Sequence, residues 1–299
     1  MPHPESLIRT IADRHGLAGG LELLPKGGMV NEAWAIGDSH ILRIVTEGND
    51  AECDDEAPRE AAVVPLVVVA GITAPRLVAH DLAFAPRPYS IYEMASGELV
   101  GYSGRDYGHF TAAYGQMGRD LTKLHSLNID VGARTKLRTA ESYDFEKWIA
   151  RAEERGSVSK ENVADIKGTV ARWREIGGQP AFECLVHNDL HPWNLMGDPE
   201  TGALTAILDW GDASFGDPAR DFAMMPLPCV PAMLDGYAST GGTVDDAFVA
   251  RSLVVGMSVA LFEVSTPEMA DFYRRWWRMP PGGWSEMKSL VAQFWPELM

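Results

Sequence analysis

Three oxygen-bearing side chains in the segment 182–222 have the types and spacing of a metal-dependent phosphoryl-transfer site. Asp189 and Asn194 lie in a polar loop, and Asp209 ends the apolar run Leu204–Leu208. Magnesium prefers one or two carboxylates with neutral oxygens, and it keeps places for phosphate oxygens and water. An acid that accepts a hydroxyl proton completes such a site. Asp and Asn are common turn residues, so each one alone is better explained by a turn, and only the set indicates chemistry.

Short strands are expected to position this loop. Apolar runs flank the loop, and turn residues separate the later runs, over the ranges Cys184–Val186, Leu195–Met196, Asp198–Gly202 and Leu204–Leu208. Apolar runs bounded by turn residues predict strands. We therefore expect a hairpin that places Asp189 and Asn194 on one loop and Asp209 at the end of the next strand.

The first hundred residues are expected to form a small antiparallel sheet around one helix. The predicted strands, the first two of them a hairpin, are Met29–Ile36, His40–Val45, Pro75–Ala79 and Pro88–Met94. Gly27–Gly28 precedes the hairpin. A glycine pair lets the backbone approach a phosphate, but a plain turn is the simpler explanation.

The helix of this region is predicted over Pro58–Ala70. Acidic residues precede Pro58, as is common at a helix start, and Gly71 follows its end. Pro65 should kink the helix or end it early, because proline cannot donate a backbone hydrogen bond. Val63–Val69 could instead form a buried strand.

The remainder of the chain is expected to be mainly helical. Apolar residues recur at helical spacing in Phe110–His125, Phe145–Ala152 and Val163–Trp173, and the part from Asp245 onward has the same character. A small sheet followed by helices predicts an α+β architecture with two lobes, and Gly97 marks the predicted boundary between them.

Composition limits the partners. The 299 residues carry a net charge of −16, which should repel nucleic acid and anionic membranes. The most apolar stretch, Ala61–Ala70, is too short to span a bilayer, and no secretory signal is visible. Cys53, Cys184 and Cys229 have neither disulfide nor zinc spacing. We expect a cytoplasmic monomer or weak dimer without a nucleic-acid or membrane partner.

Taken together, the motifs resemble the aminoglycoside phosphotransferase family, whose members are relatives of protein kinases. The resemblance is carried by His187-x-Asp189 with Asn194, by Ile207-Leu208-Asp209-Trp210 and by Gly216-Asp217-Pro218-x-x-Asp221. It covers roughly residues 20–225. It implies a bilobal, protein-kinase-like fold. Residues 1–96 would form a nucleotide-binding lobe with a hinge at its end, and residues 97–299 a helical lobe with the catalytic loop and acceptor site.

The resemblance also implies a role for each matching residue. Asp189 is the catalytic base, and Asn194 and Asp209 hold Mg²⁺ on the phosphates of ATP or GTP. His187 supports the catalytic loop, and Asp217 and Asp221 are expected to hydrogen-bond loop backbone. The residues implied to bind the nucleotide are Arg43, Glu60, Asn31, Tyr92, Glu93, Ala95 and Leu208.

Arg43 departs from the family pattern, in which lysine is more common at this position. A guanidinium keeps the positive charge and can fork to Glu60 or to phosphate, but it is longer and planar, so the replacement is not conservative. Some members of the wider family, macrolide phosphotransferases among them, carry arginine there, so we still expect activity.

These inferences predict a kinase that moves the γ-phosphoryl group of ATP or GTP to a hydroxyl of a small molecule. The net charge favours a cationic acceptor such as an aminoglycoside or basic peptide antibiotic. The resemblance implies antibiotic resistance. The acids expected to bind the acceptor are Asp235, Glu263, Glu268 and Asp271, and Asp245 and Asp246 add to the acidic character of the same lobe.

Two alternatives stay open. The first is a kinase of the same fold for choline, homoserine, a sugar or a macrolide. Its acceptor groove could be lined by Met269, Trp276, Trp277, Met279 and Trp284, although such residues more often form core. The second is a non-catalytic nucleotide-binding pseudokinase, which only Arg43 supports.

Overall fold

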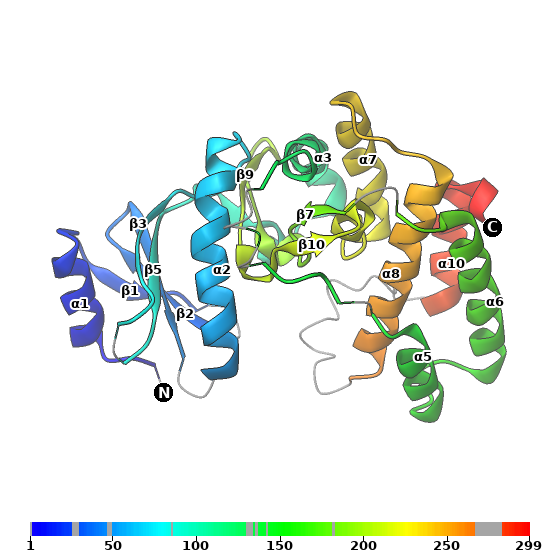
Figure 1. The fold of residues 1–299 in the computed structure, drawn as a ribbon, viewed down its shortest axis with the longest axis horizontal. Coiled ribbons are helices and arrows are strands. Elements are labelled where there is room, and N and C mark those ends of the chain that lie inside the picture. Colours follow the sequence, from blue (N-terminus) through cyan, green and yellow to red (C-terminus); the bar gives the residue numbers. More distant parts are fainter. Residues whose placement is uncertain are drawn as a thin grey trace.

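The structure is a computed structural model that describes residues 2–25, 30–46, 50–84, 86–129, 134, 137–141, 143–180, 183–266 and 283–299, and for residues 50–54 only the backbone. Gly27–Gly28, the side chain of Cys53 and the segment 267–282 lie outside the described residues. The chain forms a sheet flanked by α1 and α2, beside a larger and mostly helical part (Figure 1).

A five-stranded antiparallel sheet has the order β1-β2-β3-β5-β4. Its strands are β1 Leu21–Leu23, β2 Asn31–Ile36, β3 His40–Val45, β4 Leu77–Asp81 and β5 Tyr89–Glu93. The predicted hairpin is confirmed, because β2 and β3 pair with Ile36 opposite His40. Gly37 in its turn has a φ of 56°, which glycine adopts without strain.

Helices cover both faces of this sheet. α1 (Glu5–Arg14), which the sequence analysis did not predict, packs its buried residues into a cluster with Trp34, Leu42 and Ile91. α2 lies on the opposite side of the strands (Figure 1). Because successive side chains of a strand point to opposite faces, Leu42 enters the cluster with α1 while Arg43 turns toward α2.

α2 runs from Asp50 to Val69 and includes both Pro58 and Pro65. The predicted helix is therefore confirmed, although it begins at Asp50 rather than Pro58, and the strand alternative is wrong. The hydrogen bond lost at Pro65 is offset by buried valines on the same helix, Val63, Val64 and Val67. Gly71, with a φ of 71°, follows the helix end as predicted.

Helices dominate the larger part. They are α3 Thr111–His125, α5 Phe145–Glu154, α6 Lys160–Gly177, α7 Val230–Ser239, α8 Asp246–Val264 and α10 Gly283–Phe294. The three predicted amphipathic helices are confirmed as α3, α5 and α6. α3 and α7 cross at glycine, since a Cβ at Gly118 would lie 2.0 Å from the carbonyl oxygen of Met233.

α8 is the one helix of the described residues that is long and apolar enough to cross a membrane. Within the structure, 67% of its apolar window is buried, as in the core helix of a globular protein. The helix expected from Asp245 onward is confirmed as α8, but the expectation that Ala61–Ala70 is the most apolar stretch overlooked how apolar α8 is. Its apolar composition reflects packing against α5 and α6.

Two small sheets frame the segment that carries the motifs. β7 (Cys184–Val186) pairs with β10 (Ser214–Gly216), while β8 (Leu195–Gly197) lies between β6 (Glu98–Leu99) and β9 (Leu204–Ile207). The expected hairpin is confirmed as β8–β9, but the pairing of β7 with β10 was not predicted. Both ends of the loop 187–194 are thereby anchored, by β7 before it and by β8 after it.

Candidate active site

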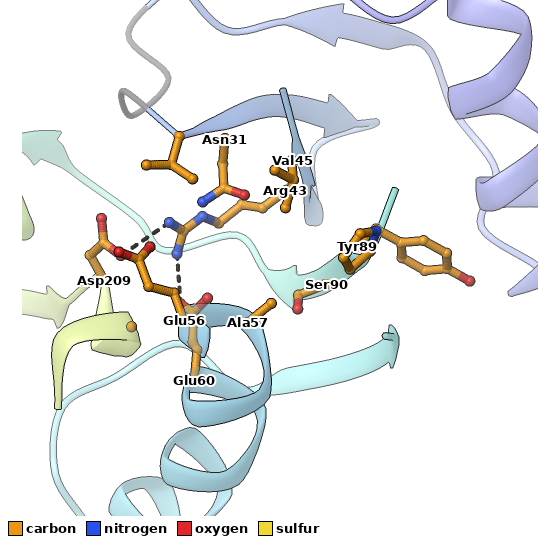
Figure 2. Close-up of a pocket in the computed structure, with 12 residues that line it drawn as sticks. Asn31, Arg43, Val45, Glu56, Ala57, Glu60, Tyr89, Ser90 and Asp209 are labelled. Carbon is orange, nitrogen blue, oxygen red and sulfur yellow. Dashed lines mark hydrogen bonds and ion pairs between the residues drawn. The ribbon is translucent and has the colours of Figure 1, made fainter. Parts of the chain in front are cut away.

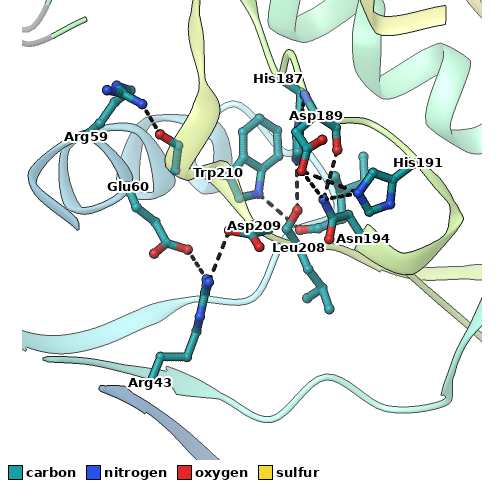
Figure 3. Close-up of polar contacts among 12 residues, drawn as sticks. Arg43, Arg59, Glu60, His187, Asp189, His191, Asn194, Leu208, Asp209 and Trp210 are labelled. Carbon is teal, nitrogen blue, oxygen red and sulfur yellow. Dashed lines mark hydrogen bonds and ion pairs between the residues drawn. The ribbon is translucent and has the colours of Figure 1, made fainter. Parts of the chain in front are cut away.

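Asp189, Asn194 and Asp209 line one cleft. Its volume is about 760 Å³, and its walls come from the five-stranded sheet, from α2, from the loop 187–194 and from the end of α8. The convergence of the three oxygen donors is therefore present in the folded chain. Figure 3 shows the loop residues gathered on one side of the cleft and Arg43 reaching toward Asp209 from the sheet.

The loop 187–194 holds its two polar residues against each other. The Nδ2 of Asn194 donates to the backbone oxygen of Asp189 at 2.9 Å and to its Oδ2 at 3.0 Å. Asn188 has a φ of 69°, and such left-handed residues turn the chain sharply. Among the described residues, no hydrogen bond engages the side-chain oxygen of Asn194.

Asp221 holds the backbone of the loop 187–194 in place through hydrogen bonds. Its carboxylate is buried and accepts the N–H groups of His187 at 3.0 Å and of Asn188 at 2.8 Å, and it lies 3.0 Å from His125 Nε2. Burial alone would raise the pKa of Asp221, but His125 and the loop contacts together lower it. The predicted bonding of Asp221 to the loop backbone is confirmed.

His187 joins the loop to the strand that delivers Asp209. The side chain is fully buried, and its Nε2 lies 2.9 Å from the carbonyl oxygen of Leu208. Its Nδ1 accepts the N–H of Asp189 at 3.4 Å. Both ring nitrogens thus contact backbone atoms, in agreement with the predicted supporting role. Asp217 accepts the N–H of Ala219 at 3.0 Å and pairs with Arg251.

Arg43 forks between the two parts of the molecule. One guanidinium nitrogen lies 2.6 Å from Glu60 Oε1 on α2, and the other lies 3.1 Å from Asp209 Oδ1 (Figures 2 and 3). Burial acts to lower the pKa of Arg43, but Asp209 and Glu60 outweigh it and raise the pKa, so the guanidinium stays charged. The expected Arg43–Glu60 ion pair is present.

His191 is a site residue that the sequence analysis missed. Its Nε2 lies 3.4 Å from Asp189 Oδ2, and the side chain lines the cleft. Burial acts to raise the pKa of Asp189, but His191, His187 and Asn194 lower it to about 2. In return, Asp189 raises the pKa of His191 against the effect of burial. The available signal was a titratable residue two positions after Asp189 in the same polar loop.

The residues expected to bind the nucleotide fall in two places. Those that line the large cleft are Arg43, Glu60, Tyr92, Glu93, Ala95 and Leu208. The Glu93 carboxylate pairs with Arg76, and the Glu93 N–H donates to the backbone oxygen of Arg76 at 3.0 Å. Asn31 instead lines a polar cavity of about 20 Å³ behind Arg43, together with Glu56 and Ser90 (Figure 2).

Of the four acids expected to bind an acceptor, the two that the structure describes do not lie together. Glu263, on α8, is 7% exposed and lines the cleft. Asp235 is exposed on α7 and does not line the cleft. Glu268 and Asp271 lie outside the described residues. Trp284 is buried and donates to Asp165 at 2.7 Å, so it is a core residue rather than part of a groove.

A family model described as the phosphotransferase enzyme family matches residues 23–260. This chain belongs to that family. The residues matched include Arg43, Glu60 and the whole segment from His187 to Asp209.

Two curated relatives of this phosphotransferase-family chain match over part of their length. The uncharacterized protein YcbJ of Bacillus subtilis is 30% identical over 87 residues, which is 25% of this chain and 28% of that protein. Acyl-CoA dehydrogenase family member 11 of Mus musculus is 23% identical over 161 residues, which is 52% of this chain and 20% of that protein. The chain thus spans about a quarter of one and a fifth of the other.

Solved phosphotransferases share the fold over nearly the full chain. The GDP complex of an aminoglycoside 2′-phosphotransferase-IIIa superposes with a TM-score of 0.70 at 15% identity over 98% of both chains. The macrolide 2′-phosphotransferase MphH of Brachybacterium faecium gives 0.58 at 18% identity, over 97% of this chain and 98% of that one. The predicted α+β, protein-kinase-like fold is confirmed.

The donor set of this phosphotransferase-family site fits Mg²⁺. Asp209 offers a carboxylate and Asn194 an amide oxygen, and Mg²⁺ takes few protein ligands because it keeps waters and substrate phosphates. Among the described residues there is no cluster of three or more His, Cys, Asp or Glu side chains able to enclose a metal. One carboxylate and one amide oxygen suit an ion whose other ligands are waters and nucleotide phosphates.

Proposed function

We propose that the chain is a kinase that transfers the γ-phosphoryl group of ATP or GTP to a hydroxyl of a small molecule. The observation that carries this proposal is the convergence of Asp189, Asn194 and Asp209 in one cleft, opposite the Arg43–Glu60 pair. Membership of the phosphotransferase enzyme family supports it.

In the proposed step the acceptor hydroxyl gives its proton to the carboxylate of Asp189. The acceptor oxygen forms a bond to the γ-phosphorus, while the bond from that phosphorus to the β–γ bridging oxygen breaks. The nucleoside diphosphate leaves with the electron pair of the broken bond. Because such transition states are loose, alignment and charge neutralisation supply most of the rate enhancement.

Asp209 and Asn194 would hold Mg²⁺, which neutralises phosphate charge when bound. Arg43 would bind phosphate oxygens from the sheet side, and Glu60 holds the guanidinium in place. The base would lie between Leu208 and the sheet, with backbone groups of Glu93 and Ala95 at its edge. These roles suit ATP and GTP alike, and competition between the two nucleotides measures the preference.

We propose a cationic acceptor, of the aminoglycoside or basic peptide type, and hence a role in antibiotic resistance. The net charge of −16 and the buried Glu263 in the cleft support it. Solved family members in complex with streptomycin and ATP, with kanamycin or with gentamicin have this fold. The reaction would take place in the cytoplasm, and the enzyme would act as a monomer or weak dimer.

A largely apolar acceptor, such as a macrolide, is the second candidate. Apolar and aromatic side chains beside the loop favour it: the cleft is lined there by Tyr102, Trp193, Met224, Val259 and Phe262. Such walls bind the rigid apolar face of a ligand through burial of surface.

A nucleotide-consumption screen tests the proposal. The purified chain is incubated with Mg²⁺ and ATP or GTP across aminoglycosides, basic peptides, macrolides and hydroxylated metabolites, and products are identified by mass. We expect one class to gain a single phosphoryl group, and Asp189→Ala to abolish the gain. Equal consumption by the wild type and Asp189→Ala with every acceptor would instead favour the nucleotide-binding pseudokinase.

A further inference from the structure

His191 faces the proposed active site, yet the transfer step above gives it no role. The side chain lines the cleft and is 24% exposed. Its backbone is extended, with φ −142° and ψ 166°, because it directly precedes Pro192 at the start of the short 3₁₀ helix 192–194. This conformation places its ring beside the carboxylate of Asp189.

The surrounding contacts identify the nitrogen of His191 that carries a proton. Nδ1 is buried and has no hydrogen-bond partner in the described structure. Orphaned buried N–H groups are rarer than orphaned acceptors, so a neutral ring carries its proton on Nε2. The Asn194 amide nitrogen lies 2.9 Å from the Asp189 backbone oxygen, 3.0 Å from Asp189 Oδ2 and 3.4 Å from His191 Nε2. Its two hydrogens go to the two nearer oxygens, so Nε2 is left to donate to Asp189 Oδ2 as well.

Asp189 therefore has two unequal oxygens. Oδ2 faces two donors, the Asn194 amide at 3.0 Å and His191 Nε2 at 3.4 Å. Within the described chain no donor is recorded for Oδ1. An oxygen that already accepts two hydrogen bonds is a weaker proton acceptor than one that accepts none.

We propose that His191 is a positioning residue that, with Asn194, engages Asp189 Oδ2 and so presents Oδ1 to the acceptor hydroxyl. The proposal rests on the proposed kinase function, in which Asp189 receives the proton of that hydroxyl. His191 acts through Asp189 and not as a base, because its Nε2 already carries a proton and cannot accept the proton of the acceptor hydroxyl.

Neighbouring rings hold His191 in this orientation. Its ring meets Trp193 edge-on, with centroids 5.7 Å apart and an interplanar angle of 86°. Trp193 in turn stacks on Tyr102, with centroids 5.9 Å apart and an angle of 28°. His187, the other histidine of the loop, is committed to the carbonyl of Leu208 and cannot replace it.

Steady-state kinetics of His191→Leu, His191→Gln and the control His80→Leu test the role. His80 is exposed on β4, away from the cleft. We expect His191→Leu to lower kcat about 10- to 100-fold with little change in either KM, since a misplaced catalytic group costs rate rather than binding. The side-chain amide of glutamine can place an N–H at a similar distance from Asp189 Oδ2, so His191→Gln should recover most of kcat. Wild-type kcat in His191→Leu, or a loss confined to KM, would overturn the proposal.

A second measurement is independent of turnover. In spectra of the ¹⁵N-histidine-labelled protein, the signal absent from His191→Leu belongs to His191. We expect its Nε2 to be protonated and to shift when Asp189 becomes Asn, while the His80 signal stays in place. An unprotonated Nε2 or an unmoved signal would refute the contact. A chain without kinase activity that gives the expected spectra would refute the proposed function and not this contact.

Discussion

At the scale of single residues, the site is a set of charges that depend on one another. Arg43 holds two acids at once, and Asp189 lies among His187, His191 and Asn194. The Arg43 contacts join the sheet to α2 and to Asp209 of the larger part, and the Asp189 contacts lie within the loop 187–194. Substitutions at these residues should therefore change stability as well as activity.

Replacing Arg43 by Met should destabilise the fold through Glu60. The Glu60 side chain is 9% exposed and Arg43 lies 2.6 Å from it, so the variant leaves a buried carboxylate unpaired. Breaking a buried pair in this way costs about 3 to 5 kcal/mol. Chemical denaturation should show a loss of this order for Arg43→Met and a smaller loss for Arg43→Met/Glu60→Gln. Equal losses in the two variants would contradict the coupling.

The depressed pKa of Asp189 predicts a pH-dependent contribution to stability. Its folded pKa is about 2, below the ordinary aspartate value near 4. A lowered folded pKa stabilises the native state above the unfolded value, and this contribution is lost as the pH falls from about 4 toward 2. The denaturation midpoint of the wild type should therefore exceed that of Asp189→Asn at pH 6, and the difference should shrink below pH 4. A constant difference would contradict this origin.

At the scale of elements, close packing of α3 on α7 depends on glycine. A Cβ at Gly118 would lie 2.0 Å from the backbone oxygen of Met233, so one helix must move if alanine is introduced. Overpacking of this kind costs about 1 to 3 kcal/mol. We expect Gly118→Ala to lower the free energy of unfolding by that amount.

Gly168 provides the matched control for this substitution. It lies in α6, and no atom is within 4 Å of the position that a Cβ would take. Alanine has a higher helix propensity than glycine by about 1 kcal/mol, so Gly168→Ala should stabilise. Thermal or urea unfolding compares the two, and a change of the same sign in both variants would refute the packing argument.

The elements that are defined by apolar periodicity and turn residues within a short segment could be predicted from the sequence. The hairpin β2–β3, the helices α3, α5 and α6, and the hairpin β8–β9 follow from apolar periodicity and turn residues. α1 and the pairing of β7 with β10 were missed, because a docked terminal helix and a strand pair between distant segments depend on tertiary contacts. His191 was missed for a similar reason. Its place in the site depends on how its side chain is oriented toward Asp189, and residue spacing alone does not define that orientation.

At the scale of the whole molecule, we propose that residues 94–97 form the hinge between a lobe ending at residue 96 and a lobe beginning at residue 97. β5 ends the five-stranded sheet at Glu93, and β6 begins at Glu98, where it already pairs with β8 of the larger part. Gly97 has a φ of 97°, and a Cβ there would lie 2.3 Å from the carbonyl oxygen of Gly197. The connection is thus short and sterically restricted.

Net charge makes a prediction at this scale. A chain of charge −16 should attract a cationic acceptor over distances near the Debye length, about 8 Å at physiological ionic strength. If the acceptor is an aminoglycoside, its kcat/KM should fall as salt is raised from 50 to about 500 mM, while that of an uncharged acceptor should change little. Equal salt dependence for both acceptors would contradict electrostatic capture.

The position of α8 along the chain has a consequence for biosynthesis. α8 packs on α5, α6 and the segment 218–222, all of which precede it in the sequence. A ribosome makes the chain from its N-terminus, so those partners emerge with their apolar faces uncovered until residues 246–264 follow. A nascent chain arrested before Asp246 should therefore be cut readily by protease in α5 and α6, and release of α8 from the exit tunnel should protect both helices.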